Sequence, residues 1–216
     1  MTTIPVGSRA MNSARYLVPN GCTATSMLFG LASVMCSAQG AFDLAAWMIL
    51  WGVLLDKLDG VTARLMKATS EFGMQFDSFA DFVVFGIAPG ALIYFRCADM
   101  ERFQTQWGSA MLLIAVGLYI VMTSVRLARF NIVSPPDGDS IFYGIPTTLC
   151  GAVLASGYLT CSVYGLGDAY IELFPVYLVV GAAAMVSQLR LPKLKGRKNP
   201  FIHWFQIINI VGVYSL

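Results

Sequence analysis

Charged side chains are scarce in this 216-residue sequence: they make up 12% of it, whereas hydrophobic residues make up 57%. Soluble domains contain about 25% charged residues, so this composition excludes an ordinary soluble domain. Apolar stretches close to the length of a membrane-spanning helix recur along the chain, and a helix satisfies its own backbone hydrogen bonds inside a bilayer. The sequence therefore predicts an all-α, polytopic membrane bundle.

Paired cysteines and basic, aromatic-rich segments are also missing. The five cysteines are scattered without a CxxC pair, which argues against a disulfide framework or a zinc site. No basic run is interleaved with aromatic residues in a soluble setting, so we expect membrane lipids rather than nucleic acid as partners. The N-terminal segment lacks the order of basic, apolar and small residues that marks a cleaved signal peptide.

Six apolar stretches are predicted to span the membrane. They cover approximately residues 17–37, 42–59, 77–95, 107–126, 145–164 and 170–189, and polar loops are expected at 96–106 and 131–140. The short connection around Gln39-Gly40 suggests a hairpin between the first two spans. The final apolar stretch, 201–216, is short for a span, and is either a seventh helix or an interfacial segment. We expect residues 1–216 to form one integral membrane catalytic domain. Its parts are a juxtamembrane segment (1–16), a six-helix core (17–190) and a basic loop with an apolar tail (191–216).

Positive charges are distributed unevenly between the two ends of the predicted spans. If the N-terminus is cytoplasmic, 12 of the 14 lysines and arginines lie on the cytoplasmic side, and only Arg96 and Arg102 lie on the other. Cytoplasmic loops are enriched in Lys and Arg. We therefore expect a protein of the cell (inner) membrane, with its N-terminus and the acidic segment 56–81 facing the cytoplasm.

Segment 56–81 places four carboxylates at fixed spacing in this apolar chain. Asp56 and Asp59 share one face of a helix, and so do Asp77 and Asp81. Two helices in a hairpin can direct all four at one small volume, although each charge costs roughly 2.5–3.5 kcal/mol at the centre of a membrane helix. Divalent cations bound by carboxylate oxygens, Mg²⁺ above all, would offset this charge. Two such ions form a clamp suited to phosphoryl transfer.

Small residues and one arginine accompany the acids. Gly60 and Ala63 lie one helical turn apart, where small side chains let a phosphate or a flat ring approach the backbone. Helix–helix packing is the alternative interpretation of this pair. Arg64 offers a planar fork suited to phosphate oxygens, or else snorkels at the end of the span.

The pattern Asp56-x2-Asp59-Gly60-x2-Ala63-Arg64-x8-Gly73-x3-Asp77-x3-Asp81 resembles the signature of the CDP-alcohol phosphotransferase family, integral membrane enzymes of phospholipid synthesis. The resemblance implies that the four aspartates bind two divalent cations, Mg²⁺ or Mn²⁺, and that Asp81 is also the catalytic general base. Homodimers are usual in the family, so a homodimer is expected. The residues implied for binding the CDP-lipid are Asn20, Thr23, Asp59, Gly60, Ala63, Arg64, Ser70 and Gly73.

Three further stretches resemble bacterial and archaeal phosphatidylserine synthases of the membrane type: FDSFADFVVFGIAP (76–89), RLARFN (126–131) and FYGIP (142–146). Phosphatidylglycerophosphate and cardiolipin synthases usually read LDPxADK in the first stretch, where this chain has Ser78 and Phe82. Val84 departs from the group, which usually has serine there. The resemblance implies transfer of the phosphatidyl group of CDP-diacylglycerol to L-serine, with release of CMP. The lipid tails stay open between diacylglycerol and archaeol.

Three polar residues near the end of the fourth predicted span are candidates for binding serine. Arg126 and Arg129 suit its carboxylate, or else anchor the span by the positive-inside rule. Asn131 accepts from the serine amine, or else caps the loop. Two alternatives stay open: another acceptor, such as glycerol phosphate or an inositol phosphate, and a membrane metal-ion carrier. A metal-ion carrier would not require Gly60, Ala63 and Arg64 at this spacing from the aspartates.

Overall fold

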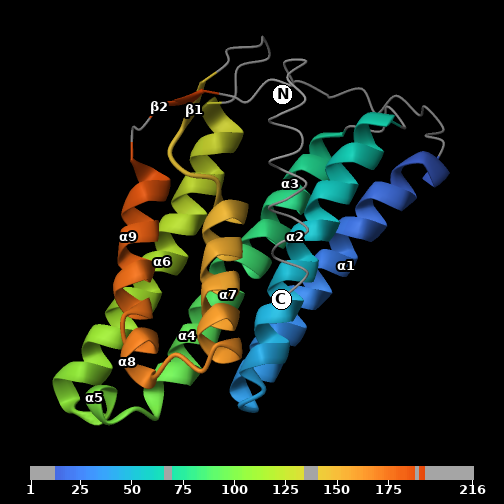
Figure 1. Cartoon of the computed structure of the whole chain (residues 1–216). Helices are drawn as coiled ribbons and strands as arrows, with labels where there is room; N and C mark the ends of the chain where they lie inside the picture. Colours follow the sequence, from blue (N-terminus) through green and yellow to red (C-terminus); the bar gives the residue numbers. More distant parts are fainter. Residues whose placement is uncertain (1–12, 66–69, 134–140, 188–189, 193–216) are drawn as a thin grey trace, which may run out of the picture.

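The computed structural model describes residues 13–65, 70–133, 141–187 and 190–192, and within them the chain is helical apart from one pair of short strands (Figure 1). The elements in chain order are α1 (Ser13–Ala38), α2 (Phe42–Leu65), α3 (Glu71–Asp81), the π-helix η1 (Phe82–Ile87), α4 (Ala88–Ala98), α5 (Glu101–Gln104), α6 (Gln106–Val133), β1 (Ile141–Tyr143), α7 (Thr147–Val163), α8 (Asp168–Ile171), α9 (Phe174–Val186) and β2 (Arg190–Pro192).

Within the described ranges, four helical segments are long and apolar enough to cross a membrane: Tyr16–Ala38, Glu71–Ala98, Gln106–Ile132 and Asp168–Val186. Of the other two long helices, α7 is apolar but has 17 residues, and α2 has 24 residues but includes Asp56, Lys57 and Asp59. The predicted all-helical class is confirmed, with four candidate membrane spans in the described chain. The count of six spans stays a prediction, and residues 201–216 lie outside the described part of the chain.

Several predicted boundaries are wrong. The third helical segment begins at Glu71 because Ser70 caps it: the Ser70 hydroxyl accepts a hydrogen bond from Gly73 N at 2.9 Å. The sixth predicted span is interrupted between α8 and α9, where Pro175 lies in the first turn of the new helix. The segment expected to be a polar loop between the third and fourth spans contains the end of α4 and the short helix α5.

The last two turns of α6 were also misassigned. We predicted that the fourth span ends near Arg126 and that 131–140 is a loop, but α6 continues to Val133. The sequence has no proline until residue 135, so nothing stops the helix earlier. Asn131 is therefore helical, and residues 134–140 lie outside the described chain.

Helices α1 and α2 form the predicted hairpin around Gly40, whose φ is +79°. Two hydroxyls of α1 join the helices: Ser33 Oγ donates to Ala45 O at 2.9 Å, and Ser26 Oγ donates to Gly52 O at 3.2 Å. Small and hydroxyl residues are typical of close helix contacts in membranes. Gly52 also faces η1 closely, since a Cβ there would lie 2.5 Å from Val84 Cγ1.

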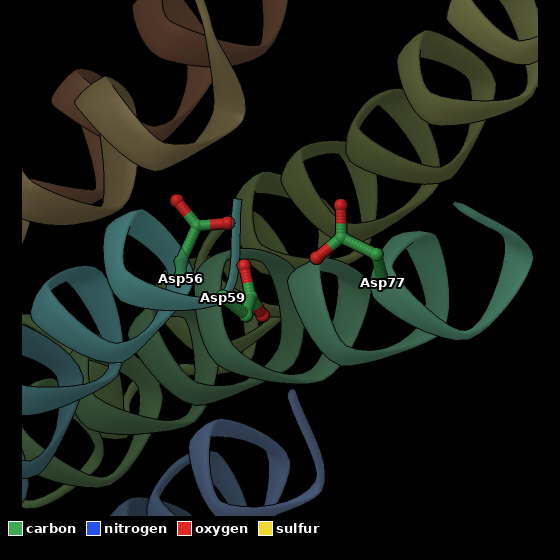
Figure 2. A group of neighbouring side chains, drawn as sticks. All are labelled: Asp56, Asp59 and Asp77. Atoms are coloured by element: carbon green, nitrogen blue, oxygen red, sulfur yellow. The ribbon is translucent and has the colours of Figure 1, made fainter. Parts of the chain in front are cut away.

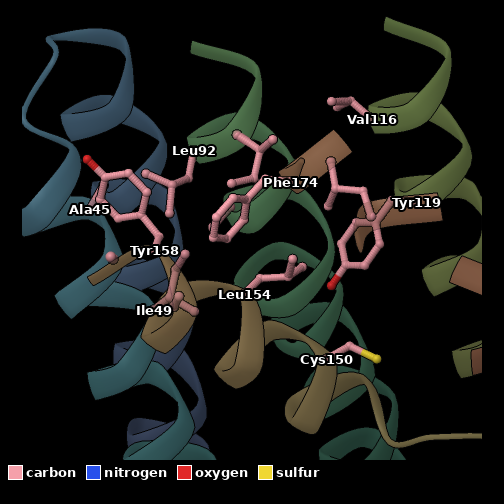
Figure 3. Packing of buried hydrophobic residues seen from close by; sticks show 14 of the residues in the cluster. Ala45, Ile49, Leu92, Val116, Tyr119, Cys150, Leu154, Tyr158 and Phe174 are labelled. Carbon is pink, nitrogen blue, oxygen red and sulfur yellow. The ribbon is translucent and has the colours of Figure 1, made fainter. Parts of the chain in front are cut away.

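The buried core lies between α2, η1, α4, α6, α7 and α9, and Figure 3 shows part of it. Its largest fully buried side chains include Tyr119, Phe85 and Ile49. At one end of the bundle, Arg96 pairs with Asp168 at 2.7 Å and Arg102 pairs with Glu172 at 3.3 Å. These are the two arginines that the charge distribution assigned to the side opposite the acids.

Two short strands, which the sequence did not predict, lie near the end of α9 (Figure 1). β1 pairs antiparallel with β2, and the register places Phe142 opposite Leu191. Gly144 follows β1 with a φ of +75°, and a Cβ there would lie 2.1 Å from Met185 O. Only glycine fits this approach, which explains its place in the FYGIP motif. Residues 190–192 thus form a strand, where we expected the end of the core and a basic loop.

Candidate active site

Three carboxyl groups converge where α2 lies beside α3. Asp56 and Asp59 lie one turn apart near the end of α2, and Asp77 comes from α3 (Figure 2). One oxygen of each lies within 4.8 Å of the others. Asp59 is buried, and the other two are partly buried. The predicted hairpin geometry therefore brings these acids to one volume.

Asp81 completes the group from the last position of α3. Its carboxyl is in side-chain hydrogen-bond contact with that of Asp56, and it also lies within electrostatic range of Asp77 and Asp59. Directly after Asp81 the helix changes to the π-helix η1. Short π-helical turns inside α-helices are frequent at functional sites. All four predicted acids are thus neighbours in space.

A hydroxyl from α1 holds one of these acids. Thr23 Oγ1 lies 2.8 Å from Asp59 Oδ2 and 3.1 Å from Pro19 O, and the threonine is buried. A hydrogen bond to a ligating carboxylate orients it toward a metal. Sequence reasoning assigned Thr23 to the nucleotide, and missed this contact because it joins residues on two different helices.

A cavity of about 490 Å³ opens beside the acids. It is lined by Pro19, Asn20, Thr23, Asp59, Gly60, Ala63, Ser70, Glu71, Gly73, Met74 and Asp77. Seven of the eight residues predicted to bind the CDP-lipid are among them. The eighth, Arg64, belongs to α2, and its side chain lies outside the described part of the structure.

The cavity has a wall suited to phosphate. The N-terminus of α3 contributes Ser70, Glu71 and Gly73, and a helix N-terminus favours anions through its backbone N–H groups. On α2, a Cβ added at Gly60 would have no described atom within 4 Å. A ligand can therefore approach the α2 backbone at this point without displacing protein.

The two arginines predicted to bind serine differ in their surroundings. Arg126 lies within electrostatic range of Asp81, and its Nε is buried with no hydrogen-bond partner among the described residues. Arg129 contacts the end of α9, since its Nη1 donates to Val186 O at 3.5 Å. The structure therefore places Arg126 near Asp81, and it shows Arg129 in contact with α9.

Asn131 lies in the last turn of α6, against α3, rather than in a loop. Its Nδ2 lies 3.0 Å from Ser78 Oγ and 3.3 Å from Gln75 Oε1. The sequence singled out Ser78 only as a departure from the related LDPxADK motif. It contained no signal for Gln75.

The donor set suits a hard divalent cation. Carboxylate oxygens are the ligands that Mg²⁺, Mn²⁺ and Ca²⁺ prefer. Around an octahedral Mg²⁺, adjacent ligand oxygens lie about 3.0 Å apart and opposite ones about 4.2 Å apart. The oxygens of the three acids lie within 4.8 Å of one another, so side-chain rotations that bring them closer would let them bind one ion. The residues present therefore fit a metal ion.

Comparison with known proteins agrees with this site. The family model for CDP-alcohol phosphatidyltransferases matches residues 16–191. The chain belongs to this family. The matched region includes every acid of the cluster and every residue that lines the cavity.

Relatives of this chain include proteins named as serine O-phosphatidyltransferases and an archaetidylserine synthase. The chain is 33% identical to a CDP-diacylglycerol–serine O-phosphatidyltransferase of Helicobacter pylori, over 83% of this chain and 73% of the relative. An archaetidylserine synthase of Methanothermobacter thermautotrophicus is 30% identical, over 77% and 66% of the two chains. The corresponding serine O-phosphatidyltransferase of Mycobacterium leprae is 31% identical, over 90% and 63%.

Proposed function

We propose that this chain transfers the phosphatidyl group of CDP-diacylglycerol to the hydroxyl of L-serine, giving phosphatidylserine and CMP. The observation that carries the proposal is the convergence of Asp56, Asp59, Asp77 and Asp81 beside a polar cavity in a membrane protein. The named relatives support serine as the acceptor, since all three act on serine or form a serine lipid by name.

The reaction is a substitution at phosphorus. Asp81 accepts the proton of the serine hydroxyl, whose oxygen forms a bond to the lipid-linked phosphorus. The bond from that phosphorus to the oxygen of CMP breaks, and CMP leaves with the electron pair. A positioned base contributes about 10²–10⁴-fold to such a step. Asp56, Asp59, Asp77 and Asp81 would hold two divalent cations, which supply charge stabilisation for the transferred phosphoryl group.

The donor occupies the cavity in this proposal. Gly60 and Ala63 let the nucleotide approach α2, and the N-terminus of α3, which begins after Ser70, offers backbone N–H groups as donors to phosphate oxygens. Asn20 and Arg64 complete the donor site, as the resemblance implies. Because the cavity adjoins Asp59 and Asp77, a pyrophosphate bound in it reaches the metal ligands.

Arg126 is the residue that we assign to the serine carboxylate. Its proximity to Asp81 would place a bound serine beside the base. Its buried Nε has no hydrogen-bond partner among the described residues, and is a strong donor in need of an acceptor. The contact of Arg129 with Val186 supports a role in holding α6 to α9.

The arrangement in the membrane is part of the proposal. We infer six spans, with α2 and α7 added to the four apolar segments, and a cytoplasmic acidic end, where a soluble acceptor reaches the site. The charge distribution of the sequence supports this orientation in the cell membrane. The homodimer implied by the family resemblance stays a prediction.

An acceptor panel tests the reaction. The purified chain is supplied with CDP-diacylglycerol, Mg²⁺ and one of L-serine, glycerol 3-phosphate or inositol phosphate, and CMP and the lipid product are measured. We expect phosphatidylserine. Product formed only with a non-serine acceptor would contradict the assignment of serine as the acceptor. Uptake of divalent metal into vesicles without any release of CMP would favour a metal carrier.

A further inference from the structure

A polar seam joins α3 to the end of α6, in a part of the bundle where apolar packing is the usual rule. We define the α3–α6 seam by Gln75, Ser78 and Asp81 on α3, with Arg126 and Asn131 on α6. The three α3 residues are spaced three apart, so Ser78 is a helix-surface neighbour of both Gln75 and Asp81. Asn131 contacts the first two, and Arg126 lies near the third. The seam thus leads along α3 to the proposed base.

The hydrogen-bond donors of the seam can be assigned by counting protons. Ser78 Oγ has one proton and two acceptors in range, Met74 O at 3.1 Å and Asn131 Oδ1 at 3.3 Å. Asn131 Nδ2 has two protons, with Ser78 Oγ at 3.0 Å and Gln75 Oε1 at 3.3 Å. The arrangement that uses every proton has Ser78 donating to Met74 and Asn131 donating to both Ser78 and Gln75.

This assignment fixes the orientation of the Asn131 amide. In this arrangement both amide protons of Asn131 are donated to α3. No described group then donates to its carbonyl oxygen, which can accept a hydrogen bond from a ligand. A carbonyl oxygen accepts from an ammonium group more strongly than from a hydroxyl, because the first hydrogen bond is charge-assisted, and it offers nothing to a phosphate. Ser78, which Asn131 contacts, lies next to Asp77 and one helical turn before Asp81. An acceptor held there suits the ammonium group of a ligand whose hydroxyl reaches Asp81.

We propose that Ser78 and Gln75 are positioning residues that hold the Asn131 amide, and that Asn131 selects acceptor alcohols bearing an amino group. This inference rests on the proposed function and refines its acceptor site. Ser78 stands where the LDPxADK motif has proline, and is one of the positions at which this sequence departs from that motif. A proline there would carry no hydroxyl for Asn131 to donate to.

Steady-state kinetics with Ser78→Ala test the positioning role. Loss of one hydrogen bond of ordinary net strength predicts a rise in KM for L-serine of about fivefold. The kcat and the KM for CDP-diacylglycerol should change by less than about twofold, whereas a merely structural role would lower kcat or affect both substrates. Ser78→Thr keeps a hydroxyl and should restore the serine KM. The matched control is Ser124→Ala on α6, because the Ser124 hydroxyl also donates to a carbonyl of its own helix, Val121 O.

Coupling between the residues gives the second readout. Because Ser78 acts through Asn131, the double variant Ser78→Ala/Asn131→Ala should have the same serine KM as Asn131→Ala alone. The exposed Gln75→Ala should raise the serine KM less than Ser78→Ala. The inhibition constant of 3-hydroxypropanoate, which resembles serine without its amine, should be the same in the wild type and all of these variants.

The outcomes separate this inference from the proposed function. Wild-type enzyme that makes no product from serine overturns the proposed function before any variant is compared. Serine product from the wild type, combined with additive effects of Ser78→Ala and Asn131→Ala, overturns the positioning role alone. Weaker binding of 3-hydroxypropanoate in Asn131→Ala overturns the assignment of Asn131 to the amine.

Discussion

Asp81 lies at the junction of α3 and η1, in contact with Asp56 and within range of Arg126. This placement gives the carboxyl two neighbours with different proposed tasks, a metal ligand on one side and the acceptor site on the other. A base between the two can take a proton from the acceptor without leaving the metal site.

Asp81→Asn keeps the size of the side chain and removes its basicity. We expect turnover to fall by about 10²–10⁴-fold, the usual contribution of a positioned base, while CDP-diacylglycerol still binds. Product formation and donor binding are measured on the same preparation. Asp99→Asn, at an exposed aspartate after α4, should behave as wild type. Wild-type turnover in Asp81→Asn would refute the assignment of the base.

Thr23→Val removes the hydroxyl that contacts Asp59 and keeps the shape of the side chain. Loss of an outer partner of a metal ligand costs about 10–100-fold in metal affinity or activity. We therefore expect a higher Mg²⁺ requirement, with activity recovering at high Mg²⁺. The exposed Thr25→Val on the same helix is the control. An unchanged Mg²⁺ dependence would show that Thr23 does not support the metal site.

Gly60→Ala separates ligand approach from helix packing. The added methyl would meet no described atom within 4 Å, and alanine is a better helix former than glycine by about 1 kcal/mol. Thermal stability should therefore be kept, while the KM for CDP-diacylglycerol rises by about tenfold because the methyl occupies the cavity wall. That factor corresponds to about 1.4 kcal/mol.

Gly117→Ala is the matched control for that variant. A Cβ added at Gly117, on α6, would also meet no described atom within 4 Å, but Gly117 is not among the residues that line the cavity. Its donor KM should equal that of the wild type. A Gly60→Ala enzyme with an unchanged donor KM would favour the alternative interpretation of Gly60 and Ala63, helix packing.

At the scale of elements, the π-helix η1 determines how the acidic end of α3 continues into the core. Its Phe85 carbonyl accepts a 2.7 Å hydrogen bond from the buried Tyr119 hydroxyl on α6. The same element carries Val84, which packs closely against Gly30 and Gly52. These contacts fix the start of η1, and with it the position of Asp81.

Tyr119→Phe tests this role of η1. A buried carbonyl left without its donor costs about 1–3 kcal/mol of stability, and we expect turnover to fall because Asp81 is less well held. Tyr158→Phe removes the hydroxyl of another buried tyrosine of the core (Figure 3). That hydroxyl contacts Arg96 and Asp43 at the other end of the bundle. Turnover and thermal unfolding are compared for both. Equal turnover at equal stability loss would contradict a specific role for η1.

Sequence patterns predicted some of the helices and turns but not others. Apolar length predicted the helices, and the hairpin at Gly40 followed from a short polar connection. The π-helix was not predictable, because it depends on Tyr119 and the two glycines of other helices. The extension of α6 to Asn131 was missed because a polar residue after a long span looks like the start of a loop.

At the scale of the whole molecule, the bundle brings together segments that are far apart in the sequence. The spacing of the four aspartates predicted that they share two helix faces, and the structure brings them together. The contacts of Thr23 with Asp59 and of Ser78 with Asn131 join positions 36 and 53 residues apart. Such pairs depend on helix packing, so one sequence without relatives could not predict them.

The account as a whole depends on metal ions between α2 and α3. Four carboxyls this close in an apolar bundle would be stabilised by cations, and the same cations would bind the pyrophosphate of the donor. Removal of metal should therefore abolish both turnover and tight donor binding, and Mg²⁺ or Mn²⁺ should restore them together.

The most direct test is a titration of the chelator-treated enzyme with Mn²⁺, followed by electron paramagnetic resonance in the presence of CDP-diacylglycerol. We predict two bound ions per chain, and loss of this binding in Asp56→Asn and Asp77→Asn. Full turnover of the metal-free enzyme, or equal Mn²⁺ binding in both variants, would contradict the account.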